Sequence, residues 1–381
     1  MTIVCQMRNS VARMLGKVRE HWQILLATSA VVLILFYRLL VEGGIPLGHD
    51  MLPRINSASD NHPVSVWSDM DFGGYRIFRL KTLLSFINKL VRDPILIVCA
   101  ERAFELFLSS LLMYILMLYL TGNKHGALVS SMTYMLSPWF VCHLISGHEE
   151  SLLYALLPLF FFTLEKALRL GSFRWRASLA ILIALFFMVY PPSLLYLMPF
   201  AFLQVLVLIS TSEARGRRKL ALNLAKTILT CCLICPPLLA YQVIPMLMGA
   251  YSAAYAVATG FTLEEHKIYS ASIAEAILGL LRPPAPGFSY ITYEGVQIVI
   301  LAAVPSLATI SLIIPLKTRR NFRQSRIWAS VMLILAIFLG KGPREPLPQL
   351  YIWLVGTVPY IRFLHIPSNW LMFSVLAYCI L

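Results

Sequence analysis

Acidic side chains, a histidine and paired glycines are concentrated in one stretch of an otherwise apolar chain. His49 and Asp50 follow a long apolar run and a short turn rich in glycine and proline. A carboxylate held at such a point could act as a general base toward an acceptor hydroxyl, with its pKa tuned by its neighbours. A solvated aspartate that stabilises its own turn is the alternative, and Asp50 alone leaves both open.

Two further acidic sites could hold a metal. Asp69 and Asp71 precede Gly73-Gly74, and alternating carboxylates can share a divalent cation such as Mg²⁺ or Mn²⁺ through their oxygens. A surface turn explains this spacing as well. Glu149-Glu150 follows His148 before another apolar run, where one acid could complement the dipole of a helix N-terminus and a second could bind a ligand.

Two later motifs stand at the ends of apolar runs. Tyr190-Pro191-Pro192-Ser193 is typical of a turn that ends one helix and starts the next. Arg362, His365, Asn369 and Trp370 are types that contact phosphate or sugar, with arginine as a charge clamp and tryptophan as a stacking face. A snorkelling arginine and an interfacial tryptophan are the ordinary alternative.

The elements that position these motifs are membrane helices. Hydrophobic residues make up 59% of the 381 residues and charged residues 13%, a balance typical of a multi-pass membrane protein. The net charge of +14 comes from short basic clusters between apolar runs, as in cytoplasmic loops, and not from a nucleic-acid-binding surface. We therefore expect an integral plasma-membrane protein, in contact with lipid, with a cytoplasmic N-terminus and the polar motifs on the outer face.

The apolar runs predict an all-α bundle of about ten transmembrane helices. Residues 1–22 form a basic cytoplasmic N-terminus, and residues 23–381 form one transmembrane domain. Its long outer loops are 42–100, which contains an amphipathic surface helix at about 78–91, and 246–294. The expected helices cover about 23–41, 101–120, 126–145, 151–168, 177–190, 194–210, 220–245, 295–316 and 327–340, with a tenth that the end of the chain truncates.

Charged residues are expected to be nearly absent from the spans, with Arg102 on the outer side of the membrane near the interface. A proton- or ion-coupled transporter normally needs ionisable groups within the membrane. This distribution therefore disfavours a transporter.

The motifs resemble those of a known group of proteins. The order of first helix, long outer loop with an aspartate, surface helix and second acidic outer loop is similar to the GT-C superfamily of membrane glycosyltransferases. More closely, the motifs resemble the bacterial and archaeal membrane proteins labelled "6-pyruvoyl-tetrahydropterin synthase-related". The segments that carry this resemblance are Gly48–Arg54, Trp67–Tyr75, Gly147–Glu150, Tyr190–Pro192 and Ile366–Trp370.

The resemblance implies transfer of a sugar from a polyprenyl-phosphate carrier to an acceptor, with Asp50 as the catalytic carboxylate. It also implies that Glu149 or Glu150 binds the metal or the carrier phosphate. The resemblance adds nothing for Asp69 and Asp71, which stay a candidate second set of metal ligands with a surface turn as the alternative. The residues expected to bind substrate or carrier phosphate are His49, Arg54, His148, Glu149, Glu150, Arg362 and His365. The alternative is a non-catalytic membrane protein, either a lipid-linked saccharide flippase or an assembly scaffold. The sequence does not identify a protein partner.

Overall fold

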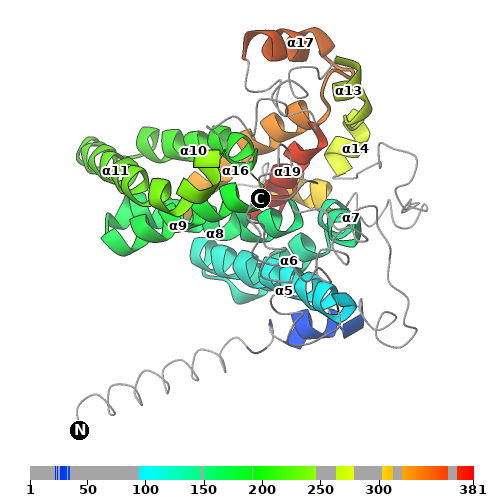
Figure 1. Ribbon diagram of the computed structural model, residues 1–381, viewed down its shortest axis with the longest axis horizontal. Coiled ribbons are helices and arrows are strands. Elements are labelled where there is room, and N and C mark those ends of the chain that lie inside the picture. The colour runs from blue at the N-terminus through cyan, green and yellow to red at the C-terminus, as the bar shows by residue number, and fades with distance from the viewer. Residues whose placement is uncertain are drawn as a thin grey trace.

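The computed structural model is helical throughout its described part (Figure 1). It describes residues 94–146, 150–190, 192–245, 263–278, 303–311, 320–358 and 367–381, together with helical residues between 22 and 34. The predicted all-α class is confirmed for these residues.

Five described helices are long and apolar enough to cross a bilayer. Their apolar parts are 18 to 27 residues long, close to the ~20 residues that span the hydrocarbon core. These helices indicate an integral membrane protein with several passes. The total of about ten spans stays a prediction. The candidate spans are Cys99–Thr121, Glu150–Leu170, Ser193–Ser210, Ala214–Ala240 and Phe322–Gly340.

The first of these helices starts earlier than predicted. Helix α5 covers Pro94–Thr121, because proline at a helix start loses no hydrogen bond that the helix needs. The last seven residues of the predicted outer loop 42–100 are therefore helical. Helix α5 packs along α8, which covers Glu150–Leu170 and confirms the predicted helix 151–168.

The predicted helix 126–145 is wrong as one continuous element. It is divided into α6 (Lys124–Met135) and α7 (Pro138–Ser146). Pro138 lacks the N–H that a continuous helix would use, and it disfavours helical geometry in the residue before it. Asn123 caps α6 by accepting the backbone N–H of His125 at 3.0 Å, which makes the tight turn that the sequence predicts.

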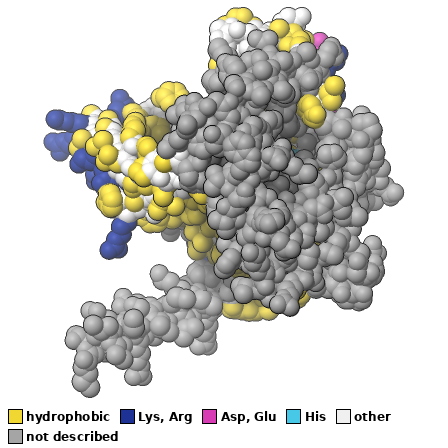
Figure 2. Space-filling model, viewed as in Figure 1, with side chains coloured by type: hydrophobic (Ala, Val, Ile, Leu, Met, Phe, Trp, Pro, Cys, Tyr) yellow, Lys and Arg dark blue, Asp and Glu magenta, His cyan; other side chains and the backbone are white. Residues whose placement is uncertain are grey.

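Three basic clusters in the described part of the chain lie in helix ends, where the prediction had placed them in loops. They occupy the first turns of α9 (Phe173–Val189), α11 (Ala214–Pro245) and α16 (Arg320–Gly340). Arginine and lysine are good helix formers, and their long stems carry the charge beyond the helix. Figure 2 shows many of these side chains gathered at one end of the molecule, where Figure 1 places α9 and α11. We call this the basic end.

Shorter helices complete the described part. Helix α10 (Ser193–Ser210) joins α9 to α11. Helices α13 (Leu263–Ile268) and α14 (Ile273–Leu278) lie within the predicted outer segment 246–294, and residues 303–311 are helical within the predicted span 295–316. After α16 come α17 (Pro348–Thr357), the 3₁₀ helix η3 (Pro367–Trp370) and α19 (Leu371–Ile380).

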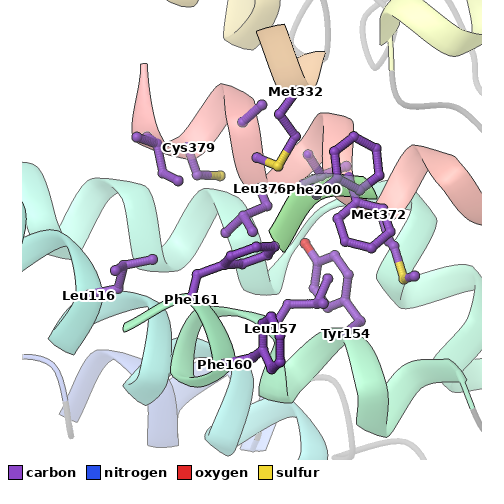
Figure 3. Packing of buried hydrophobic residues seen from close by; sticks show 14 of the residues in the cluster. Leu116, Tyr154, Leu157, Phe160, Phe161, Phe200, Met332, Met372, Leu376 and Cys379 are labelled. Atoms are coloured by element: carbon purple, nitrogen blue, oxygen red, sulfur yellow. The ribbon is translucent and has the colours of Figure 1, made fainter. Parts of the chain in front are cut away.

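The core is formed where α19 packs against α16, α8 and α10. All ten residues of α19 are buried, so this helix has protein on every side. Figure 3 shows Phe161, Phe200, Met332 and Leu376 meeting from these four helices. Tight aromatic contacts, such as the 4.2 Å between the ring centroids of Phe200 and Phe373, fix these helices relative to one another.

Candidate functional site

Most of the predicted site residues lie outside the described residues. This applies to Asp50 and its neighbours in the first loop, to the surface helix at 78–91 and to the metal set. Glu150 is the only member of the predicted site that the structure describes. The predictions that therefore stay untested concern His49, Asp50, Arg54, Asp69, Asp71, His148, Glu149, Arg362 and His365.

Glu150 lies in the first turn of α8, with only 8% of its surface exposed. The Asn369 side-chain amide donates a hydrogen bond of 3.3 Å to the Glu150 carboxylate, across 219 residues of sequence. The helix dipole favours a carboxylate in a first turn, as the capping interpretation expects. The bond from Asn369 adds a specific orientation, so Glu150 is held by two separate parts of the fold.

Tyr196 of α10 joins this pair. Its hydroxyl is hydrogen-bonded to Asn369, and its ring lies 4.8 Å from the Trp370 ring, centroid to centroid. Three motifs that are distant in sequence therefore meet here: the acidic motif at Glu150, the segment after Tyr190, and the segment 366–370. The sequence singled out these motifs but carried no signal of their contact.

Trp370 is a core residue and not an open stacking face. It is fully buried, and the rings of Tyr196, Phe200 and Phe373 lie around it at centroid distances of 4.8 to 6.3 Å. A sugar therefore has no free face of the indole to stack on. The indole N–H has no hydrogen-bond partner among the described residues.

The Tyr190–Ser193 motif forms the turn that its prolines predict. Helix α9 ends at Val189, and α10 begins at Ser193. The Ser193 hydroxyl donates to the Phe186 carbonyl at 2.9 Å, and the Ser193 N–H donates to the Tyr190 carbonyl at 2.8 Å. The structural interpretation explains these contacts without a ligand.

An ionic cluster that the sequence analysis missed adjoins Glu150. The Arg102 guanidinium donates to the Glu105 carboxylate at 2.7 Å and to the Ser151 hydroxyl at 2.6 Å. Ser151 in turn donates to Glu105 at 2.6 Å, and the Glu101 carboxylate lies 4.0 Å from Arg102. We call these four buried residues the α5–α8 ionic cluster.

This cluster corrects the expectation that charges are nearly absent from the spans. Glu101, Arg102 and Glu105 all lie in the candidate span Cys99–Thr121, and each is at most 8% exposed. The i,i+3 spacing of Arg102 and Glu105 was the available signal, since it places both on one helix face. Their partner on α8 could not be seen in the sequence.

The cluster and Glu150 lie at the end of the bundle opposite the basic end. Glu150 begins α8 and Arg169 lies in its last turn. A helix of 21 residues is about 30 Å long, so these two residues are separated by roughly the thickness of a bilayer core. The described motif residues thus share one side of the bundle. The compartment that this side faces stays a prediction.

A metal site is not evident in the described part of the chain. No three His, Cys, Asp or Glu side chains there are grouped so that they could hold an ion. Cys231, Cys232 and Cys235 of α11 are free thiols, and the Cys235 thiol donates to the Ala180 carbonyl at 3.3 Å.

Comparison with known proteins gives no relative. No family model, no curated protein and no solved structure matches this chain.

Proposed function

We propose that this chain is a multi-pass membrane glycosyltransferase of the GT-C type. It transfers a sugar from a polyprenyl-phosphate carrier to an acceptor at the outer face, through a bundle of about ten spans with a cytoplasmic N-terminus. The acceptor oxygen attacks the anomeric carbon, the bond from that carbon to the phosphate oxygen breaks, and polyprenyl phosphate leaves with the electron pair. Asp50 takes the proton of the acceptor hydroxyl.

One observation carries this proposal: Glu150, Tyr196 and Asn369 meet at one end of the bundle, from three segments distant in sequence. Glu150 and Asn369 belong to motifs on which the resemblance to the narrower membrane family depends, and Tyr196 follows the third such motif, Tyr190–Pro192, on the same helix–turn–helix segment. A buried carboxylate oriented by an amide is suited to hold a metal ion or to position a carrier phosphate through one. In this proposal Glu150 has that role, and Asn369 orients it.

The test is sugar transfer in proteoliposomes that contain the full chain, a labelled polyprenyl-phosphate sugar and an acceptor. Asp50→Ala and Glu150→Gln should each lower the rate of transfer by about 10²-fold or more, a typical contribution of a positioned acid or base. Glu213→Gln is the matched control, because Glu213 is exposed at the basic end and loses the same charge. Unchanged transfer in both site variants, with normal membrane insertion, would rule out the assigned roles.

A lipid-linked saccharide flippase is the second candidate, and the α5–α8 ionic cluster favours it. Ionisable side chains inside a span often mark the path of a substrate or an ion. The same proteoliposomes separate the two functions. A flippase moves the labelled lipid to the other leaflet with its sugar–phosphate bond intact, whereas a transferase releases polyprenyl phosphate.

A further inference from the structure

A lysine at the basic end has aromatic partners but no acidic one in the part of the chain that the structure describes. The Lys166 ammonium of α8 lies 4.0 Å from the centroid of the Tyr119 ring and 5.4 Å from that of Phe162. Among the described residues, no carboxylate lies within ion-pair distance of it. Lys166 is only partly buried, so its charge remains accessible.

The rings beside Lys166 form a continuous row. The Tyr119 and Phe162 centroids are 5.2 Å apart, and those of Phe162 and Trp175 are 5.5 Å apart, both with edge-to-face geometry. We call Tyr119, Phe162 and Trp175 the aromatic row. All three are partly exposed and come from α5, α8 and α9. Tyrosine and tryptophan favour the level of the lipid headgroups, because their rings are amphipathic.

The charges around this row favour an anion. Glu165 precedes Lys166, but its carboxylate accepts a hydrogen bond from Arg169 at 2.7 Å and one from the Tyr119 hydroxyl at 3.3 Å. Arg174 and Arg176 follow in the first turn of α9 and add two positive charges. One acid therefore stands against four basic residues between Glu165 and Arg176.

The site lies where the protein surface changes from basic to apolar. Helix α11 shows the change along its own length, with exposed basic residues at Arg215–Lys219 followed by the exposed apolar side chains of Leu222, Ile228 and Leu233. Figure 2 shows the same order, with Lys and Arg at the tip and hydrophobic side chains beside them. In a chain with five candidate spans, this boundary marks the headgroup level.

We propose that Lys166 and the aromatic row bind the phosphate of an anionic phospholipid at the basic end of the bundle. The ammonium pairs with the phosphate, Arg174 supports it, and the acyl chains lie along the apolar surface of α5, where Phe104 and Ile115 are exposed. The lipid is the occupant because the site combines a cation with an adjoining apolar surface. This site is independent of the proposed transferase or flippase activity.

The test is lipid binding by the full chain, purified in a neutral detergent and depleted of lipid. Phosphatidylglycerol is titrated in, and bound lipid is counted by native mass spectrometry while thermal unfolding is followed by tryptophan fluorescence. Loss of one basic residue near a membrane surface costs about five-fold in affinity for anionic lipid. Lys166→Gln should show this loss, and Lys166→Arg should stay within about two-fold of the unmodified chain.

The controls distinguish a defined site from a diffuse field. Lys226→Gln removes the same charge from an exposed position on α11 and should leave the affinity unchanged. Lys166→Met keeps the aliphatic stem over the rings and is measured in the same way, in case the glutamine variant unfolds. Equal weakening by Lys226→Gln, or none by Lys166→Gln and Lys166→Met, would overturn the site. Equal stabilisation by inorganic phosphate would overturn the lipid as its occupant.

Discussion

Neutralising Glu105 should destabilise the protein strongly, because Arg102 would be left buried without its closest counter-ion. Both side chains are 1% exposed, and the ion pair between them is 2.7 Å long. Breaking a buried pair by removing one partner costs about 3–5 kcal/mol. We expect Glu105→Gln to lie near the lower end of this range, since the Glu101 carboxylate, 4.0 Å from Arg102, compensates part of the charge.

The sharper expectation concerns the double variant. Arg102→Met alone leaves Glu105 buried without its counter-ion, at a similar cost of about 3–5 kcal/mol. Once Glu105→Gln is already present, Arg102→Met removes a buried charge that has lost its closest counter-ion, so the double variant should lose much less than the sum of the singles. The coupling free energy should therefore be about 2–3 kcal/mol.

The measurement is reversible unfolding of each variant in mixed micelles of dodecyl maltoside and SDS, followed by tryptophan fluorescence. Glu213→Gln is the control for loss of an exposed charge and should change stability by no more than about 0.5 kcal/mol. If the two single effects simply add, the residues do not act as a pair, and the reasoning that treats the cluster as one buried unit fails.

Two further predictions concern backbone and pH. Gly171→Ala should cost about 1–3 kcal/mol, because Gly171 has a φ of +65° and an added Cβ would lie 2.5 Å from the Asn223 side chain, whereas Gly216→Ala on α11 meets only Ser212 at 3.5 Å and should not destabilise. Burial raises the pKa of Tyr351, so the folded state retains a proton that the unfolded state releases. Stability should therefore fall as pH rises above about 10, and Tyr351→Phe should make that fall smaller when unfolding midpoints at pH 8 and 11 are compared, since the other buried tyrosines keep their own contributions. Burial lowers the pKa of Lys341, and this changes stability with pH in the opposite direction. Lys341 is present in both the unmodified protein and Tyr351→Phe, so the difference between their pH profiles reports Tyr351 alone.

The helices predicted most closely from the sequence are those whose limits are set by neighbouring residues in the chain. Helix α8 is an apolar run that begins at an acidic residue, and α10 is an apolar run that begins after a pair of prolines. The limits of both helices lie within two residues of the expectation. The division at Pro138 was missed because the flanking residues are apolar enough to continue a span. Pro138 was the local signal for a helix break, but the continuous hydropathy of the segment favoured a single span.

The candidate site could be predicted only in part, for a physical reason. Glu150 and Asn369 each belong to a recognisable motif, but their hydrogen bond depends on packing across 219 residues. Trp370 shows the same limit, since an indole after an apolar run suits an interface and a core equally. Arg102 was expected at the surface because burying an arginine is costly unless partners offset the cost. One of those partners, Ser151, lies on another helix and could not be assigned from the sequence.

Two sets of polar contacts between α5 and α8 together fix the register in which these helices pack. Near one end Arg102 and Glu105 of α5 bind Ser151, and at the other Tyr119 of α5 donates to Glu165. A slip of one helical turn moves a helix by about 5.4 Å, which would break both sets of bonds at once while leaving apolar contacts available. The polar groups therefore select one register where apolar packing alone would permit several. That register sets the height of the first turn of α8, so the position of Glu150 against Asn369 depends on charges at both ends of the helix pair.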